Sequence, residues 1–344
     1  MTLLQLHRSL DGPLPPMPPL ALAIGNFDGV HLGHQAILAA CREAASRLGL
    51  QPAAMTFAPL PREYFAKLKN DPALAPARLM SVTEKLAALS RADIRHAFIP
   101  RFDQAFAAQS PIEFMSRLRA LNVKWLMVGE DFRFGVRRAG DVAMLRAYGA
   151  AYGFVVETMA DIEDISGARV SSTAIRTSLG NGNLEAAQRM LGRPYSIIGR
   201  VTHGKKLGRT LGFPTANVSL TARKPALAGV FAVKLQLCFK DVEKDAKNAT
   251  RGLEGVVRTS EGNDEAFHGV ANLGTNPVVS IDNRHHLEVF LFDFSGDLYS
   301  KRVQVTFIER IRDEQNFSGP DALTALVKQM HDDCDRAKTI LRKA

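Results

Sequence analysis

The sequence predicts two domains of different class: an N-terminal α/β domain built on a parallel sheet, and a C-terminal antiparallel β-barrel with a terminal helix. With 344 residues the chain exceeds the usual size of a single domain. From Leu20 onwards strand and helix patterns alternate, which is typical of a parallel sheet covered by helices. After Tyr195 short apolar alternations follow one another without intervening helices, which indicates an antiparallel barrel or sandwich. We therefore expect domains at residues 1–185 and 186–344.

The composition and net charge of the chain indicate which classes of ligand and partner it can bind. Hydrophobic residues make up 46% of the chain, and the formal net charge of +9 favours anionic ligands such as nucleotides. The positive residues are scattered and lack interleaved aromatic residues, so we expect no nucleic-acid partner. The three isolated cysteines predict no disulfide framework, and no apolar run approaches the ~20 residues of a membrane-spanning helix. We expect a cytoplasmic protein without a signal peptide or membrane partner, and no feature specifies an oligomeric state.

The first half centres on one strand, one turn and one helix. The apolar run Leu20 to Ile24 has strand length, and the Gly/Asn/Asp cluster at 25–29 allows a sharp turn that approaches a ligand closely. A helical pattern starts at Gly33, so His31 and His34 lie in the first turn of a helix, where unpaired N–H groups favour a phosphate. The other elements expected in this half are strands at 53–57, 96–99 and 125–128 and helices at 81–89 and 111–121.

The two histidines have more than one interpretation. By itself, His-x-x-His also fits a helix-capping pair or surface histidines, and no further ligands at metal spacing support a zinc site. The complete string Gly-x-Phe-Asp-Gly-x-His-x-Gly-His, residues 25–34, resembles the signature of the HIGH-type nucleotidyltransferase superfamily. That resemblance implies that His31 and His34 stabilise charge on a triphosphate while its α-phosphorus is attacked.

Two later stretches also follow strand ends or open helices. VGEDFRFG, residues 128–135, is either an ordinary polar loop or part of a ligand site. RVSSTAIRTSL, residues 169–179, contains natural N-cap residues, with Arg176 one turn into the following helix. This stretch is therefore either a plain helix cap or a second phosphate clamp, because a guanidinium near hydroxyls binds phosphate well.

The polar residues of the second half are concentrated in HGKKLGRTLGFPTANV, residues 203–218. Its basic glycine loop is not a Walker A loop and also fits a flexible hairpin with a lysine-rich tip. If the following segment is extended, Thr215 and Asn217 lie on the same side, and their oxygen atoms suit Mg²⁺ bridging nucleotide phosphates. The strands expected here are at 195–201, 229–237, 267–273, 286–292 and 302–308, preceded by a helix ending at Gly192 and followed by a terminal helix at 321–341.

Glu288 is an acidic residue in an otherwise apolar strand. It is either an outward-facing strand carboxylate or a pocket carboxylate that accepts a proton from an attacking hydroxyl. The polar stretch 241–265 has the composition of a surface insertion, because its charged, Gly and Asn residues cannot fill a core.

The motifs of both halves resemble one family in order. The three N-terminal motifs, with TFAPLPREYF at 56–65 and RFDQAFAAQSPIEF at 101–114, resemble the adenylyltransferase half of the bacterial bifunctional riboflavin kinase and FMN adenylyltransferases. GRTLGFPTANV, GVFAV, GVANLGTNP, LEVFLFDFSGDLY and RDEQNF resemble its riboflavin kinase half. The resemblance implies a Rossmann-like FMN adenylyltransferase domain at 1–185 and a riboflavin kinase domain at 186–344.

The resemblance also implies substrates and residue roles. Riboflavin would be phosphorylated to FMN, and FMN adenylylated to FAD, with ATP as co-substrate and Mg²⁺ as cofactor. Glu288 would be the catalytic base of the kinase, and Thr215 and Asn217 would bind the metal. His31, His34 and Arg176 would act on the ATP phosphates. The residues expected to bind nucleotide are Gly25, Asn26, Phe27, Gly33, Asp131, Ser171, Ser172, Thr173, Gly204 and Gly208.

Two alternatives belong to other functional classes. One is a nucleotidyltransferase for another phosphate ester, with a non-catalytic C-terminal domain. The Pro-Thr-Ala-Asn string at 214–217 and Glu288 count against it. The other is a basic binding protein on an enzyme scaffold, which would bind RNA or DNA in a salt-sensitive way.

Overall fold

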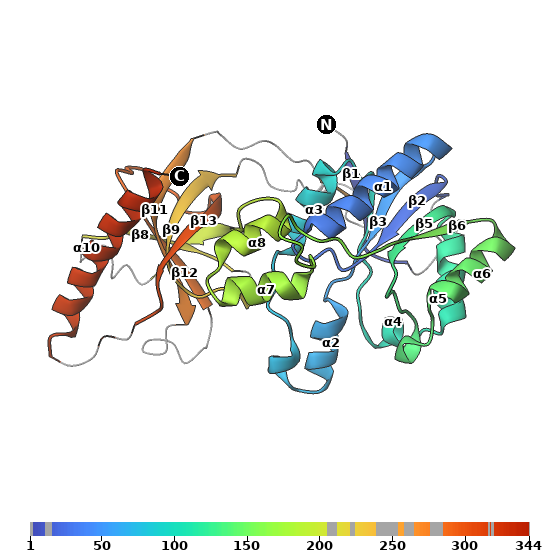
Figure 1. The fold of residues 1–344 in the computed structure, drawn as a ribbon, viewed down its shortest axis with the longest axis horizontal. Helices are drawn as coiled ribbons and strands as arrows, with labels where there is room; N and C mark the ends of the chain where they lie inside the picture. Colours follow the sequence, from blue (N-terminus) through green and yellow to red (C-terminus); the bar gives the residue numbers. More distant parts are fainter. Residues whose placement is uncertain are drawn as a thin grey trace. The chain divides into compact units, whose positions relative to one another are not determined.

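The computed structural model describes residues 3–10, 16–204, 212–220, 224–238, 254–257, 265–275, 285–315, 317 and 320–343. The chain forms two compact units, each of which is described by itself (Figure 1). The first contains Met1–Pro76, Val82–Val170 and Lys240–Thr259, and the second contains Ala77–Ser81, Ser171–Phe239 and Ser260–Ala344. Each unit thus contains one short segment that lies, in the sequence, within the range of the other unit.

The first unit is built on a seven-stranded sheet with the strand order β10-β1-β4-β3-β2-β5-β6. Every neighbouring pair is parallel except β1 with β10, which is antiparallel. The expected parallel α/β sheet is therefore confirmed. Its strands are β1 (Leu4–His7), β2 (Leu20–Ile24), β3 (Gln51–Met55), β4 (His96–Phe98), β5 (Val123–Gly129), β6 (Val155–Met159) and β10 (Glu254–Val257).

The helices of the first unit lie between these strands in the sequence, as an α/β fold requires. α1 packs on β2, β3 and β5, α5 on β5, and α6 on β6. They are α1 (Leu32–Leu48), α2 (Pro61–Leu68), α3 (Val82–Arg91), α4 (Gln104–Ala108), α5 (Pro111–Ala120) and α6 (Val142–Tyr152), with 3₁₀ turns at Pro72–Leu74 and Val136–Arg138.

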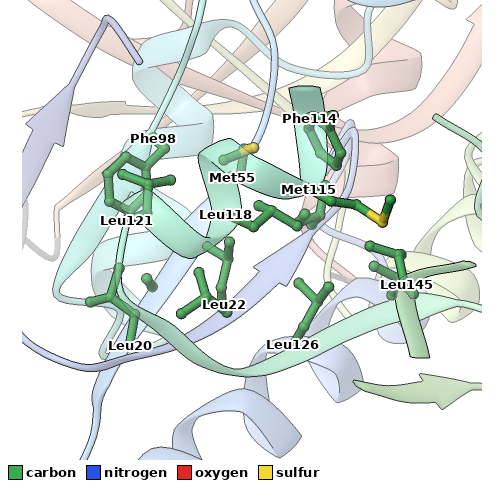
Figure 2. Close-up of a cluster of buried hydrophobic side chains, with 14 of the residues drawn as sticks. Leu20, Leu22, Met55, Phe98, Phe114, Met115, Leu118, Leu121, Leu126 and Leu145 are labelled. Carbon is green, nitrogen blue, oxygen red and sulfur yellow. The ribbon is translucent and has the colours of Figure 1, made fainter. Parts of the chain in front are cut away.

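The central strand β2 explains why helices can cover both faces of the sheet. All five of its residues are buried, and they alternate between leucine or isoleucine and alanine. Leu20 and Leu22 pack with Leu118 and Leu121 of the α5 region, as Figure 2 shows. The alanines alternate to the opposite face. There the Cys41 Sγ of α1 lies 3.2 Å from the Ala21 carbonyl oxygen, an approach that small side chains permit.

The second unit is a closed barrel with the strand order β11-β12-β8-β7-β13-β9, which confirms the expected antiparallel barrel. α10 packs on the outer face of β9, β11 and β13, as Figure 1 shows. The elements of this unit are α7 (Ser172–Gly180), α8 (Leu184–Leu191), β7 (Ser196–Thr202), β8 (Thr215–Val218), β9 (Gly229–Leu237), β11 (Ala266–Thr275), β12 (His285–Leu291), β13 (Arg302–Arg312) and α10 (Ala322–Leu341).

Several elements lie outside the expectations from sequence. The strands β6 and β10 and the helices α2, α4 and α6 are additional to those expected. Of the stretch 241–265, the described residues 254–257 form β10, an edge strand of the first unit's sheet rather than a loop of the barrel. The division between residues 185 and 186 stays a prediction; it falls inside α8, and the second compact unit already includes α7.

Candidate active sites

The loop between β2 and α1 lies at the centre of the first sheet. β2 pairs with β3 on one side and β5 on the other, so the strand order changes direction beside it, and ligands of open α/β sheets bind outside the carboxyl ends at such a point. Within the loop Phe27, Gly29 and Val30 adopt φ of 45°, 87° and 40°. For the two non-glycine residues this left-handed conformation costs about 1–3 kcal/mol each, which the surroundings must offset.

His31 and His34 lie at the start of α1, as expected. His31 is the N-cap residue, and its Nδ1 accepts a hydrogen bond from the His34 backbone N–H at 3.4 Å. The two imidazole rings stack with their centroids 3.7 Å apart, and Phe27 meets His34 edge-on at 5.2 Å. A Cβ at Gly33 would lie 3.3 Å from the His31 ring, so glycine leaves space for this stack. Their action on phosphates stays a prediction.

His34 is uncharged at neutral pH before a ligand binds. Burial lowers its pKa well below the ordinary value of 6.5, and the nearby His31 and Lys85 lower it further. Its Nδ1 is buried without a hydrogen-bond partner among the described residues. An imidazole whose polar atom lacks a partner can bind a ligand without first losing a protein hydrogen bond.

Lys85 is a residue of this site that the sequence interpretation missed. It comes from α3 and donates hydrogen bonds to the Asn26 carbonyl oxygen at 2.7 Å and to the Thr56 Oγ1 at 3.0 Å. Thr56 Oγ1 donates to the same Asn26 carbonyl at 2.9 Å. The signal available in the sequence was a single lysine next to Leu86 in a helix with an apolar face.

The loop after β5 holds the second predicted motif. Asp131 is exposed two residues beyond the end of β5, and a Cβ at Gly129 would lie 3.2 Å from its Oδ1. Phe134 pairs with Gly140 in an antiparallel bridge that closes the loop. The carboxyl ends of adjacent strands β2 and β5 thus place Asn26 and Asp131 on the same edge of the sheet.

Aromatic side chains gather near the ends of β3 and β4, and they come from the two strings at 56–65 and 101–114 that carry part of the family resemblance. Phe57 meets Phe102 and Phe106 edge-on, with centroids 5.7 Å and 5.4 Å away. Tyr64 and Phe65 of α2 contact Phe102 in the same way, at 5.5 Å and 5.9 Å. Phe65 is 45% exposed. We call these five residues the aromatic cluster.

The third predicted motif opens α7 in the second unit. Ser171 is the N-cap residue, and its side chain accepts a hydrogen bond from the Ala174 N–H at 3.1 Å. Arg176 donates from Nε to the Ala77 carbonyl oxygen at 2.6 Å. Ser172 and Thr173 begin the helix, and Thr173 is exposed. These four predicted residues are therefore brought together within the second unit, and their part in adenylylation stays a prediction.

Strand register brings the predicted kinase residues together. Glu288 of β12 lies directly opposite Asn217 of β8, and Phe290 lies opposite Thr215. Opposed residues share a sheet face with Cβ atoms roughly 4.5–5.5 Å apart, so Glu288, Asn217 and Thr215 lie on one face. Leu287 and Val289, which flank Glu288 in β12, are buried on the other face. Burial raises the pKa of Glu288, and nearby His286 partly opposes that rise.

The surroundings of Asn217 fit a small ligand site. A Cβ at Gly204 would overlap the Asn217 side-chain amide, so the glycine backbone lies directly against it. The described residues contain no group of three or more His, Cys, Asp or Glu that could hold a metal ion. Gly208, the remaining predicted residue, lies outside the described residues.

Comparison with known proteins identifies the family. Residues 16–174 match the FAD synthetase family, and residues 191–341 match the riboflavin kinase family. A bifunctional riboflavin kinase/FMN adenylyltransferase from Haemophilus influenzae is 41% identical over 337 residues, which cover 97% of this chain and 98% of that protein. The chain belongs to the bifunctional riboflavin kinase/FMN adenylyltransferase family. The Pseudomonas fluorescens member is 39% identical, with 94% of each chain covered, and the Escherichia coli K12 member is 41% identical, with 91% and 90% covered.

One solved structure agrees over nearly the whole chain. The crystal structure of a macrolide-efflux protein from Streptococcus pneumoniae aligns with a TM-score of 0.68 at 28% identity, covering 92% of this chain and 94% of that one.

Family membership decides between the functions predicted from the sequence. Riboflavin kinase and FMN adenylyltransferase activities are confirmed, with ATP as their co-substrate. A nucleotidyltransferase for another phosphate ester is not favoured, because residues 191–341 match the kinase family. No helix among the described residues is long and apolar enough to cross a membrane.

Proposed function

We propose that the two reactions occur at two separate sites, one in each compact unit. At the barrel site, the terminal ribityl hydroxyl of riboflavin attacks the γ-phosphate of ATP and gives FMN and ADP. At the carboxyl edge of the sheet, the phosphate of FMN attacks the α-phosphate of a second ATP and gives FAD and pyrophosphate. We place both reactions in the cytoplasm, because the three isolated cysteines fit a reducing compartment.

The observation that carries the kinase site is the register of β8 and β12, which sets Glu288 opposite Asn217 and beside Thr215 on one sheet face. In this proposal Glu288 accepts the proton of the attacking hydroxyl. Burial raises the pKa of its carboxyl group, which brings that pKa nearer to neutral pH and makes the carboxylate a better base. Alignment of the two substrates supplies much of the remaining rate enhancement.

The metal proposed for this site is Mg²⁺. The hydroxyl of Thr215 and the amide oxygen of Asn217 are hard oxygen donors on one face, and the close backbone of Gly204 limits the space beside them. These groups fit a cation that keeps several waters and takes few protein ligands. When bound, the ion neutralises charge on the nucleotide phosphates.

The adenylyltransferase site needs no base, because its nucleophile is already an anion. The His31 and His34 imidazoles and the N–H groups at the start of α1 would hold the negative charge of the reacting α-phosphate. Asn26, Asp131 and the glycines of the β2 loop would line the nucleotide. The aromatic cluster, with partly exposed Phe65, offers ring faces and edges for a flavin.

Paired variants of the full chain test this division. Glu288→Gln removes the base without changing the size of the side chain, so FMN formation should fall about 100-fold or more. FMN adenylylation should continue at the wild-type rate. The measurement is chromatographic separation of riboflavin, FMN and FAD, with riboflavin or FMN as the starting flavin and ATP and Mg²⁺ present.

The converse variant is His31→Ala combined with His34→Ala. FAD formation should fall by about 10²–10³-fold, the effect of losing groups that stabilise transition-state charge, while FMN accumulates. Loss of both riboflavin kinase and FMN adenylyltransferase activity in either variant would contradict the proposal of two independent sites. Normal FAD output from the double variant would remove the histidines from the mechanism.

A further inference from the structure

The loop that carries the histidine pair needs support from outside itself. Phe27 and Val30 have positive φ, a conformation that such residues keep only where surrounding contacts hold it. The position of His31 and His34 depends on this loop, because His31 follows Val30 directly and caps α1. A residue that anchors the loop therefore controls where the imidazoles lie.

Lys85 provides that anchor. It is only 3% exposed, and its ammonium and the Thr56 hydroxyl both donate to the carbonyl oxygen of Asn26, at 2.7 Å and 2.9 Å. Asn26 directly precedes Phe27, so the two donors hold the backbone where it enters the left-handed turn. A bond from an ammonium group is stronger than one between neutral groups, so Lys85 is the dominant member of this pair.

The charge of Lys85 also interacts electrostatically with His34. Burial, then His31, then Lys85 lower the pKa of His34, so this imidazole carries no charge at neutral pH. The ammonium group of Lys85 then supplies positive charge that His34 lacks before ATP arrives. A positive group within a mostly buried site attracts a triphosphate more strongly than one in bulk water.

We propose that Lys85 is a positioning residue for FMN adenylylation. It fixes the Asn26 carbonyl and thereby the loop that presents His31 and His34, and its charge favours the binding of ATP. This inference rests on the proposed role of the two histidines. It assigns a function to α3, which contributes no residue to the motifs found in the sequence.

Two substitutions separate the hydrogen bond from the charge. Lys85→Met removes both, whereas Lys85→Gln removes the charge and keeps an N–H donor on a side chain that is one bond shorter. With Lys85→Met we expect kcat for FMN adenylylation to fall about 100-fold, as for a displaced catalytic group, and KM for ATP to rise. With Lys85→Gln, much of the kcat should return while KM for ATP stays raised.

Riboflavin kinase activity and a second lysine variant serve as controls. Riboflavin kinase activity should be unchanged in both variants, because its site lies in the other unit. Lys124→Met makes the same charge change at an exposed position at the amino end of β5, and it should leave both activities unchanged. In an NMR titration of the His34 ring, both Lys85 variants should show a higher pKa than the wild type.

Three outcomes would overturn the proposal. The first is kcat and KM close to wild type in both Lys85 variants. The second is a pKa of His34 that is unchanged in both variants, together with equal losses of kcat in Lys85→Met and Lys85→Gln. The third is loss of the folded first unit in both variants, seen by circular dichroism, because Lys85 would then be a general folding residue. Separately, full FAD formation by the His31 and His34 double variant would reject the proposed function itself.

Discussion

At the scale of single residues, His7 of β1 and His96 of β4 form a buried pair that links the stability of the first unit to pH. Their Nε2 and Nδ1 atoms lie 3.2 Å apart and their rings stack. Burial lowers the pKa of His7. Burial, His7 and Arg95 lower the pKa of His96 to about 4. Both imidazoles are therefore neutral in the folded protein at pH 7.

The sign of the pH effect follows from these directions. Between pH 6.5 and about 4 the unfolded chain binds a proton at His96 that the folded chain does not, so stability falls as pH is lowered through this window. We expect the urea midpoint of the first unit to be lower at pH 5 than at pH 7. In His96→Phe the fall should be smaller, and an equal fall in both proteins would contradict this account.

Residue predictions from sequence succeeded where the signal was local. His31 and His34 could be placed at a helix start because the glycine turn and the helical pattern lie in one stretch. Lys85 could not be found, because its contacts with Asn26 and Thr56 depend on the packing of α3 against the ends of β2 and β3. The pairing of Glu288 with Asn217 likewise depends on the register of strands far apart in the sequence.

At the scale of elements, one buried ion pair joins α10 to the barrel. Arg312 of β13 donates from Nε and Nη2 to both oxygens of Asp333, at distances of 2.8–3.1 Å. Asp333 is 4% exposed and also accepts a hydrogen bond from Gln329, one turn earlier in α10. Around this pair α10 buries Ala337 and Leu341 against β9 and β13.

Removing one partner of this pair should lower the free energy of unfolding of the second unit. Asp333→Ala leaves the Arg312 guanidinium partly buried without its counter-charge, which typically costs about 3–5 kcal/mol. The free energy of unfolding of the barrel, measured with urea, should fall by that order. The neighbouring exposed Asp332→Ala is the matched control and should change it little. Equal effects of the two substitutions would show that the pair does not hold α10.

Elements with long, regular patterns were predictable, and short ones were not. α1, α5, α8 and α10 have apolar periodicity with clear start or stop signals, such as the left-handed Gly192 after α8. β10 has only four residues, Glu-Gly-Val-Val, and pairs with β1, which lies near the start of the chain. Its existence depends on that distant partner, so no local pattern could indicate it.

At the scale of the whole molecule, the two units exchange short segments of sequence. Ala77–Ser81 belongs to the unit that contains the barrel, where Arg176 bonds the Ala77 carbonyl and the Arg78 N–H donates to the Lys224 carbonyl. Conversely, β10 covers the free edge of β1 in the first unit. An uncovered edge strand exposes unpaired N–H and C=O groups and can pair with another chain.

Replacing residues 239–264 by a short glycine-containing turn tests the role of β10. β9 and β11 are antiparallel neighbours with Gln236 opposite Ala266, so a short turn can join them without disturbing the barrel. Riboflavin kinase activity should therefore keep its thermal inactivation temperature. FMN adenylylation should be lost at a lower temperature, because β1 loses a ladder worth about 1–2 kcal/mol, and light scattering should report association through the exposed edge. The single change Val257→Pro removes one N–H of the same ladder and should reproduce part of the effect. Val257 lies opposite Leu4, whereas Gln5 and His7 bond β4 and therefore direct their backbone N–H and C=O groups away from β10. If the adenylyltransferase kept its inactivation temperature in both variants, β10 would be a passive end of the insertion rather than the cover of the sheet edge.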